Sequence, residues 1–175
     1  MIGNLTITVI VDNRSDDPCL LTEHGLSFWI EADDRRILFD AEQSDMLFRN
    51  AETLGIDLRT ADTLVLSHGH YDHTGSVAKL LELNLSLSVY CHPDVLIPRY
   101  SRQADGTVRP VGMPRSACDA LHQCGGSMEN FNYPAGAGNG IHNRLYYRRR
   151  DGLDRGRADD AAEMRYLRCD YPPGI

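Results

Sequence analysis

The residues from 63 to 84 constrain the fold more than any other part of the chain. They read TLVLSHGHYDHTGSVAKLLELN, in which three histidines and an aspartate fall within six positions. The apolar run before them predicts a buried strand over residues 63 to 67, and GSVAKLLELN predicts a helix. The polar stretch SHGHYDHTG therefore lies in a loop held between two regular elements, a common location for functional residues.

The rest of the first half alternates between strand and helix patterns. Extended, β-branched segments predict strands over residues 5–11, 26–32, 35–40 and 87–92, with a hairpin turn at DD before the third. Apolar residues at helical spacing from Met46 to Leu54 predict a helix, with Gly55 as its C-cap glycine. This order of elements favours an α/β layered domain over a bundle or a sandwich.

The polar stretch carries the donor atoms of a metal site. Neutral imidazole nitrogens and carboxylate oxygens bind zinc, with Zn–N distances of about 2.0–2.1 Å. His68 and His70 are two residues apart, so in an extended segment both point toward one metal. Asp72 and His73 follow the turn and reach a neighbouring metal. Each residue taken singly is more often an ordinary loop or core group, so the joint pattern carries the prediction.

The motif H-x-H-x-D-H after a strand resembles the signature of the metallo-β-lactamase superfamily, whose members are mostly metal-dependent hydrolases. The segments VDN, LLTEHGLSFWIE, RRILFDAEQSDMLFRNAETLGIDL and GTVRPVGMP resemble its dihydropterin ribofuranosylaminobenzene phosphate synthase branch. The resemblance covers residues 1–133. It implies a metallo-β-lactamase-like αββα sandwich, of which this chain holds only the first αβ half, followed by an irregular tail over residues 134–175.

The same resemblance implies roles for the motif residues. His68 and His70 match first-metal ligands, and Asp72 and His73 match second-metal ligands. Asp72 is also the catalytic residue that manages protons, and Asp40 matches an acidic residue that supports the site from behind. The chain departs from the branch at Glu42, where glycine is usual.

Two residues outside the motif are candidates for substrate contact. His24, in EHGLS, matches the branch; it either faces the substrate or orders the site, or is a plain turn histidine. Arg109, in VRP, either holds an anionic group such as phosphate or is a solvated loop residue. Trp29 and Cys91 are expected in the core, and His92 is expected to start a helical turn.

The implied cofactors are two divalent metal ions, zinc first, with iron or manganese as alternatives. The expected function is hydrolysis, in which a metal-bound hydroxide attacks a phosphoester or related anionic, pterin- or phosphoribosyl-like small molecule. Two alternatives stay open. One is a non-catalytic metal-binding or oligomerising half-domain, and the other is a thioester hydrolase on the same fold.

The second half of the chain lacks the remaining ligands that the resemblance implies. Family members supply a third histidine, a bridging aspartate and a last histidine from later loops, whereas only His122 and His142 follow His92 here. We expect truncation or a reading-frame shift near residues 127–140, which the encoding nucleotide sequence tests. A half-fold exposes one apolar sheet face, so weak activity and a homo-oligomer that covers this face are expected.

Composition limits the partners and the compartment. The formal net charge is -7, which argues against nucleic acid as a partner. No segment approaches the length of a membrane span, and MIGNLTITVIVDN reads as a strand rather than a signal peptide. The five cysteines include no C-x-x-C pair, so a disulfide framework is not expected. A cytoplasmic protein is the expectation.

Overall fold

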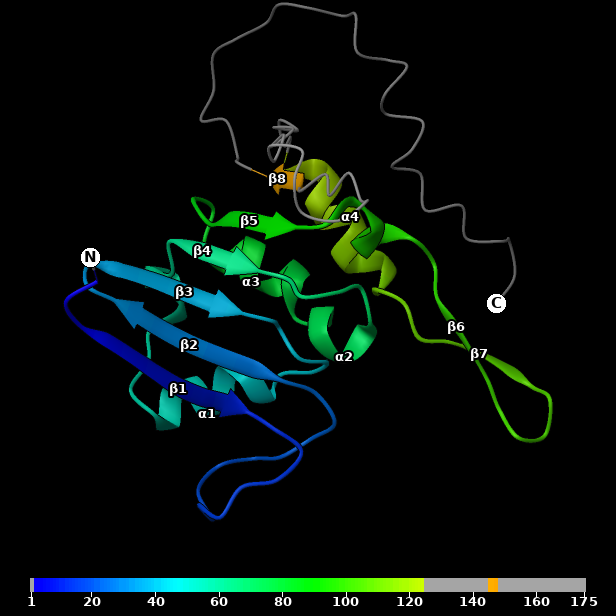
Figure 1. The fold of residues 1–175 in the computed structure, drawn as a ribbon, viewed down its shortest axis with the longest axis horizontal. Coiled ribbons are helices and arrows are strands. Elements are labelled where there is room, and N and C mark those ends of the chain that lie inside the picture. The colour runs from blue at the N-terminus through cyan, green and yellow to red at the C-terminus, as the bar shows by residue number, and fades with distance from the viewer. Residues whose placement is uncertain (1, 125–144, 148–175) are drawn as a thin grey trace, which may run out of the picture.

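The computed structural model describes residues 2–124 and 145–147. Its main sheet runs in the order β1-β2-β3-β4-β5-β8, and a two-stranded ribbon, β6-β7, projects from one end (Figure 1). The strands are β1 (Leu5–Val11), β2 (Ser27–Ala32), β3 (Arg35–Phe39), β4 (Thr63–Val65), β5 (Ser88–Cys91), β6 (Tyr100–Arg102), β7 (Val108–Pro110) and β8 (Leu145–Tyr147). The helices are α1 (Met46–Thr53), η1 (Leu58–Thr60), α2 (Tyr71–Thr74), α3 (Val77–Leu83), η2 (Pro93–Leu96) and α4 (Arg115–Gln123).

The expected α/β layering is confirmed. The strands β1, β2 and β3 pair antiparallel, and β3, β4 and β5 pair parallel, with helical connections between the parallel strands. The predicted strands and the helices after residues 45 and 76 are present. Two differences concern the motif: β4 ends at Val65, earlier than predicted, and part of the polar stretch folds into the short helix α2.

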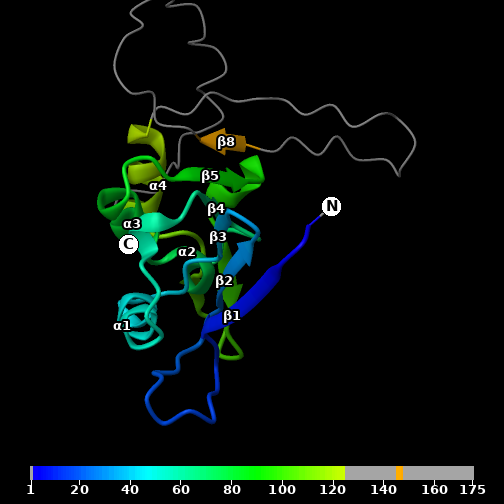
Figure 2. The same ribbon diagram turned by 90° about the vertical axis from the view of Figure 1, so that its left-hand side faces the viewer.

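The helices α1, α3 and α4 all lie on one face of the sheet (Figure 2). Beneath them the side chains of Trp29, Leu38, Leu64 and Val89, which the strand register places side by side, are buried with exposed fractions of 0–3%. Burying one large apolar side chain stabilises the fold by about 1.5–3 kcal/mol, so this layer is the main source of stability.

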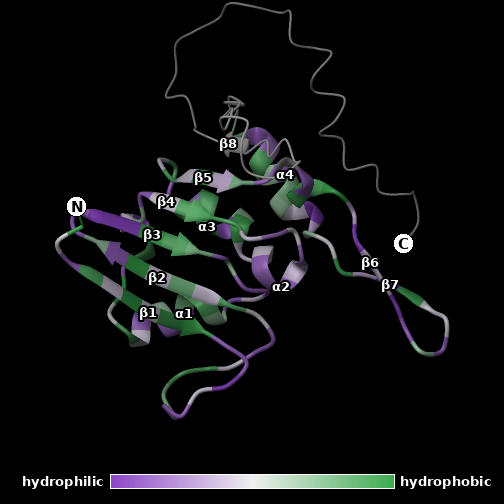
Figure 3. Cartoon of the chain, in the orientation of Figure 1, coloured by the Kyte–Doolittle hydropathy of each residue, from purple (hydrophilic) through white to green (hydrophobic). Residues whose placement is uncertain are grey.

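The opposite face of the sheet is apolar but open. Its rows pair Ile7 with Ile30 and Ile37, and Val9 with Phe28 and Phe39; none of these residues is buried. Figure 3 shows the hydrophobic colouring running across β1, β2 and β3. Within the described residues no helix covers this face (Figure 2). We call these residues, with Leu5 and Val65, the open face.

Several smaller predictions are confirmed. Trp29 and Cys91 are 3% and 4% exposed, and the side chain of His92 accepts a hydrogen bond from Asp94 N at the start of η2. Gly55 follows α1 with a φ of 71°. The predicted tail over residues 134–175, with His142, lies outside the described residues, apart from β8. No helix in the described part of the chain has the length and apolar character needed to cross a membrane.

Candidate metal centre

The motif crosses from the parallel sheet into the helical layer. After β4, residues Leu66 and Ser67 lead to His68, and His70 precedes α2 with extended dihedral angles of φ -85° and ψ 153°. A bridge between His70 and Gly112, and a hydrogen bond of 3.1 Å from Tyr71 N to Val111 O, fix this turn against the segment after β7. The ligand-type side chains therefore start from the carboxyl end of a buried parallel strand.

The three histidine rings of the motif lie against each other. The ring centroids of His68 and His70 are 4.5 Å apart, and those of His68 and His73 are 4.2 Å apart. Burial, followed by the neighbouring rings of His73 and His70, lowers the pKa of His68 below its ordinary value. This imidazole is therefore neutral near pH 7, which is the form that binds a metal.

Asp40 supports the cluster from beneath. Its carboxylate is fully buried and accepts hydrogen bonds from Ser67 N at 2.7 Å, Ser67 Oγ at 2.6 Å and His73 Nδ1 at 2.8 Å. Its own backbone has a φ of 59°, in the left-handed region. Because a carboxylate only accepts, the proton of His73 lies on Nδ1, which leaves Nε2 free for a metal.

Ser67 sets the tautomer of His68 in the same way. Its hydroxyl hydrogen is already donated to Asp40, so its oxygen accepts from His68 Nδ1, 2.9 Å away. The Nε2 atom of His68 is then unprotonated. A carboxylate–serine–histidine chain and a carboxylate–histidine pair thus start from one buried aspartate, an arrangement typical of metal-ligating histidines.

Glu42 closes the loop that follows Asp40. It is fully buried with a φ of 30°, and its carboxylate accepts from Gln43 N, Ser44 N, Leu47 N and Ser76 Oγ at 2.6–3.3 Å. The side chain joins the start of α1 to the start of α3, beside the motif. The sequence marked Glu42 only as a departure from glycine. Three of its four donors are local, and the contact with Ser76, 34 positions along the chain, depends on the tertiary fold.

Of the two candidates for substrate contact, only His24 lies near the motif. His24 lies next to the motif, with Nε2 3.2 Å from Asp72 Oδ2. Arg109 is exposed on β7, where it pairs with Ser101 of β6, and it does not line the cavity beside the motif. No observation here assigns Arg109 a contact with a substrate, and its predicted role stays a prediction.

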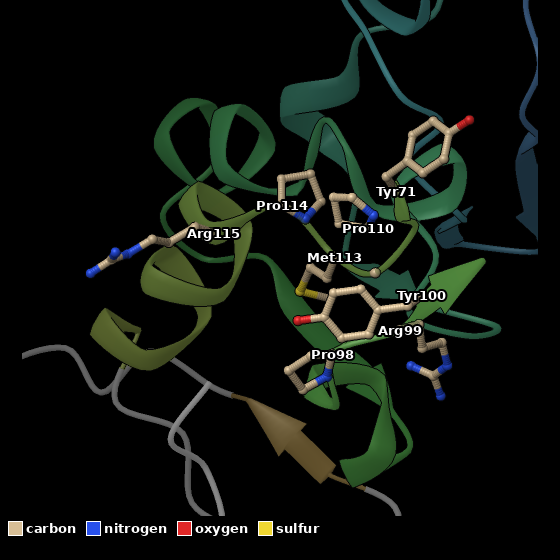
Figure 4. A pocket seen from close by; sticks show the side chains of 9 residues that line it. Tyr71, Pro98, Arg99, Tyr100, Pro110, Met113, Pro114 and Arg115 are labelled. Carbon is tan, nitrogen blue, oxygen red and sulfur yellow. The ribbon is translucent and has the colours of Figure 1, made fainter. Parts of the chain in front are cut away.

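A cavity of about 240 Å³ adjoins the motif at Tyr71 (Figure 4). Its lining residues are Tyr71, Pro98, Arg99, Tyr100, Pro110, Gly112, Met113, Pro114 and Arg115. Arg115 points away from it, and Arg99 lies beside Tyr100, apart from Tyr71 in this view (Figure 4). The sequence did not single out Arg99, because its segment, IPRY, has no pattern that distinguishes it from a loop arginine.

Arg99 approaches the motif backbone closely. A Cβ atom on Gly69, between the two first histidines, would lie 2.8 Å from Arg99 Nη1 and would also collide with the backbone of Val95. Only glycine fits at this position. The guanidinium donates to Ile97 O at 3.3 Å, which leaves further N–H groups free to bind an anion beside the motif.

The donor chemistry of the cluster fits a divalent metal. Ser67 and Asp40 contact the Nδ1 atoms of His68 and His73, so the Nε2 atoms are the ring nitrogens that could reach a metal, and Asp72 Oδ2 lies 3.5 Å from His73 Nε2. Ligand atoms about 2.0–2.2 Å from a tetrahedral ion are about 3.3–3.5 Å apart, so this pair already has ligand spacing. Among the described residues, however, no three His, Cys, Asp or Glu side chains converge closely enough to hold a metal.

The fold and the cluster together define an α/β protein with neighbouring histidine and aspartate side chains at the carboxyl end of its parallel strands. The family model described as the Metallo-beta-lactamase superfamily matches residues 22–162. The chain therefore belongs to the metallo-β-lactamase superfamily, as its motif indicated.

Two curated relatives come from Methanocaldococcus jannaschii. One, a 7,8-dihydropterin-6-methyl-4-(beta-D-ribofuranosyl)-aminobenzene-5'-phosphate synthase, is 36% identical over 80 residues, which are 42% of this chain and 27% of that protein. The other, an uncharacterised protein, is 35% identical over 96 residues, which are 54% of this chain and 37% of that protein.

Among solved structures, Tm1679, a metal-dependent hydrolase of the beta-lactamase superfamily, is 28% identical with a TM-score of 0.48. The match covers 68% of this chain and 40% of that one. The chain thus spans less than half the length of each of these relatives.

Proposed function

We propose that this chain binds divalent metal through His68, His70, Asp72 and His73 and acts as a metal-dependent hydrolase of a phosphoester or a related small anionic molecule. The observation that carries the proposal is the contact between His73 Nδ1 and the fully buried Asp40, which turns the free Nε2 toward Asp72. Zinc is the first expectation, with iron or manganese as alternatives for this donor set.

Some of these residues orient the metal ligands, and one is positioned to transfer protons. A bound divalent metal supplies Lewis acidity, which polarises a substrate oxygen and acidifies water. Asp40 and Ser67 keep the imidazoles in the ligating tautomer. The carboxylate of Asp72, whose side chain is only 9% exposed, faces the cluster and is positioned to accept a proton from a water molecule there.

The cavity beside Tyr71 supports an anionic substrate. The side chain of Arg99 borders both this cavity and the motif, so a phosphate-type group bound by the guanidinium lies next to the cluster. The tyrosine, proline and methionine walls favour an unsaturated or aromatic part of the substrate. The similarity to a protein named as a dihydropterin ribofuranosyl-aminobenzene phosphate synthase agrees with a pterin- or phosphoribosyl-like substrate.

Metal content and turnover of the purified full-length chain test this function. We expect one to two zinc, iron or manganese ions per chain by elemental analysis, together with hydrolysis of bis(4-nitrophenyl) phosphate. The substitution His68→Ala should remove most of both signals, whereas His122→Ala, on an exposed position of α4, should change neither. Hydrolysis that is unaffected by His68→Ala contradicts the proposal. A panel of thioesters separates the thioester alternative from the phosphoester one.

A second candidate is a metal-binding half-domain that oligomerises without catalysis. The open face favours it, because exposed apolar patches of this kind mark interaction surfaces. The occupant that we propose is the open face of a second copy, since rows of isoleucine, valine and phenylalanine offer no charge that would select a different partner. Metal binding without turnover, in a dimer, supports this candidate.

A further inference from the structure

The strand β1 forms one edge of the main sheet, and none of the described strands pairs with its outer side (Figure 1). Its regular part is residues 5–9, with the sequence LTITV, because the register with β2 shifts between Val9 and Val11. Free sheet edges in soluble proteins are usually protected by lysine, proline or a very short strand. Residues 2–11 contain no charged residue and no proline. The edge is therefore open to pairing with another strand.

The backbone groups that face this edge belong to alternate residues. The carbonyl oxygen of Asn4 accepts a hydrogen bond of 3.0 Å from Asp33 N, so the backbone of Asn4 faces the β2 side. The direction alternates along each strand of an antiparallel ladder, so Leu5, Ile7 and Val9 direct their N–H and C=O groups to the outer side. The outer side thus offers a row of donors and acceptors that no described strand uses.

The sequence of this edge is complementary to itself when two copies run antiparallel. In the register centred on Ile7, this residue lies opposite Ile7 of the second copy, Leu5 lies opposite Val9, and Thr6 lies opposite Thr8. Every pair then joins two apolar side chains or two threonines, which are cross-strand pairs that stabilise sheets. A two-fold interface, which uses the same patch on both copies, requires this property. The uncharged strand also lets two copies of net charge -7 meet without facing charges.

We propose that β1 pairs with β1 of a second copy, antiparallel and centred on Ile7, so that the two main sheets become one. The side chains of Leu5, Ile7 and Val9, which are 57%, 57% and 45% exposed, then lie on the same side in both copies and join the two open faces. This contact is separate from the stacking of open faces, because Ile30 lies in β2, behind the edge. A standard interface has about 20–30 residues a side, so this shorter contact is weak, and the paired form is a minor species at low protein concentration.

Disulfide trapping of the full-length chain tests this register. Thr6 and Thr8 suit the test because they pair with Glu31 and Trp29, on the face that the helices cover, so stacked open faces cannot join them. In a mixture of Thr6→Cys and Thr8→Cys proteins the two new thiols lie directly opposite, with Cβ atoms about 4.5–5.5 Å apart. In either protein alone they lie diagonally, about 7–8 Å apart. The mixture should therefore cross-link at least about 10-fold faster than either protein alone, since a disulfide does not span the longer distance. The native cysteines are the same in all three samples.

A substitution at the centre of the register separates backbone pairing from side-chain contact. Ile7→Pro, placed in both proteins, removes the central donor but no hydrogen bond to β2, because this N–H faces the free edge, where proline is tolerated. It should abolish the faster cross-linking of the mixture, whereas Ile7→Ala, which keeps the donor, should retain it. Circular dichroism checks that both variants are folded.

Equal cross-linking rates in the mixture and in the separate proteins overturn the proposal. This result is also expected if β1 binds an extended segment of a different protein instead of a second copy. The pairing needs neither metal nor turnover, so its failure leaves the proposed function in place.

Discussion

The Nδ1 atom of His73 donates a 2.8 Å hydrogen bond to Oδ2 of Asp40, a carboxylate with no exposed surface. The two residues are separated by 33 positions and come from different elements, the end of β3 and the helix α2. This contact fixes both the orientation and the tautomer of the imidazole. The orientation of this motif histidine therefore depends on a residue outside the motif.

Replacement of Asp40 should weaken metal binding although all four motif residues remain. In Asp40→Asn, the amide replaces one accepting oxygen by a donor, so His73 and Ser67 lose part of their support. We expect Zn²⁺ affinity to fall by about 10–100-fold, as for other partners behind metal-ligating histidines. Competition with a chromophoric chelator measures this change. Asp45→Asn, at an exposed residue paired with Lys79, is the matched control and should leave affinity unchanged.

Loss of the Glu42 side chain should destabilise the fold. In Glu42→Ala, the buried N–H of Leu47, in the first turn of α1, loses its acceptor, as do the part-buried N–H groups of Gln43 and Ser44. Buried donors without partners cost about 1–3 kcal/mol, so the free energy of unfolding should fall by that amount in urea denaturation. The exposed Glu52→Ala should stay within about 0.5 kcal/mol of the wild type. Equal stabilities of the two variants would show that Glu42 does not brace this loop.

Arg99 and Arg109 give a matched pair for anion binding. Arg99 borders the cavity and the motif, whereas Arg109 is exposed on β7 and lines neither. In the metal-loaded protein, Arg99→Ala should weaken binding of inorganic phosphate by about 10-fold, the equivalent of one charge-assisted hydrogen bond. Arg109→Ala should have little effect. Calorimetric titration measures both affinities. If Arg109→Ala weakens phosphate binding and Arg99→Ala does not, Arg109 and not Arg99 binds the anion.

The thiol of Cys91 should be unreactive in the native protein. Burial raises its pKa from 9.0 to about 12, so it stays protonated at pH 8 and is shielded from reagents. Titration with Ellman's reagent should modify the exposed Cys19 rapidly and Cys91 only after unfolding. Because the folded state holds this proton up to higher pH than the unfolded state, the stability that Cys91 contributes is present below pH 9 and is lost as the pH rises toward 12.

A charge on the open face should disrupt association. Ile30 lies in the middle of this face, between Ile7 and Ile37, and Ile30→Lys places an ammonium group in the proposed contact between two copies. We expect dimers by analytical ultracentrifugation for the wild type and monomers for the variant. Glu31→Lys, on the neighbouring exposed position, is the control. A monomeric wild type, or a variant with unchanged association, contradicts the self-association of this face.

Local pattern was sufficient for the order of strands and helices, because alternation in β1 to β3 and helical spacing in α1 and α3 are properties of adjacent residues. It was also sufficient for the four motif residues, since they follow one another within six positions. It did not predict α2, because a four-residue helix has too few positions to show a helical period.

The sequence by itself determined the α/β class, the superfamily and the identity of the candidate ligands. Only the tertiary structure decided which partners support them: Asp40 and Ser67 behind the histidines, Glu42 under the loop, Arg99 beside Gly69, and His24 against Asp72. The physical reason is distance along the chain. Contacts between residues 27 (Asp40 and Ser67) to 48 (His24 and Asp72) positions apart depend on how the sheet folds, and no local pattern of residue types records them.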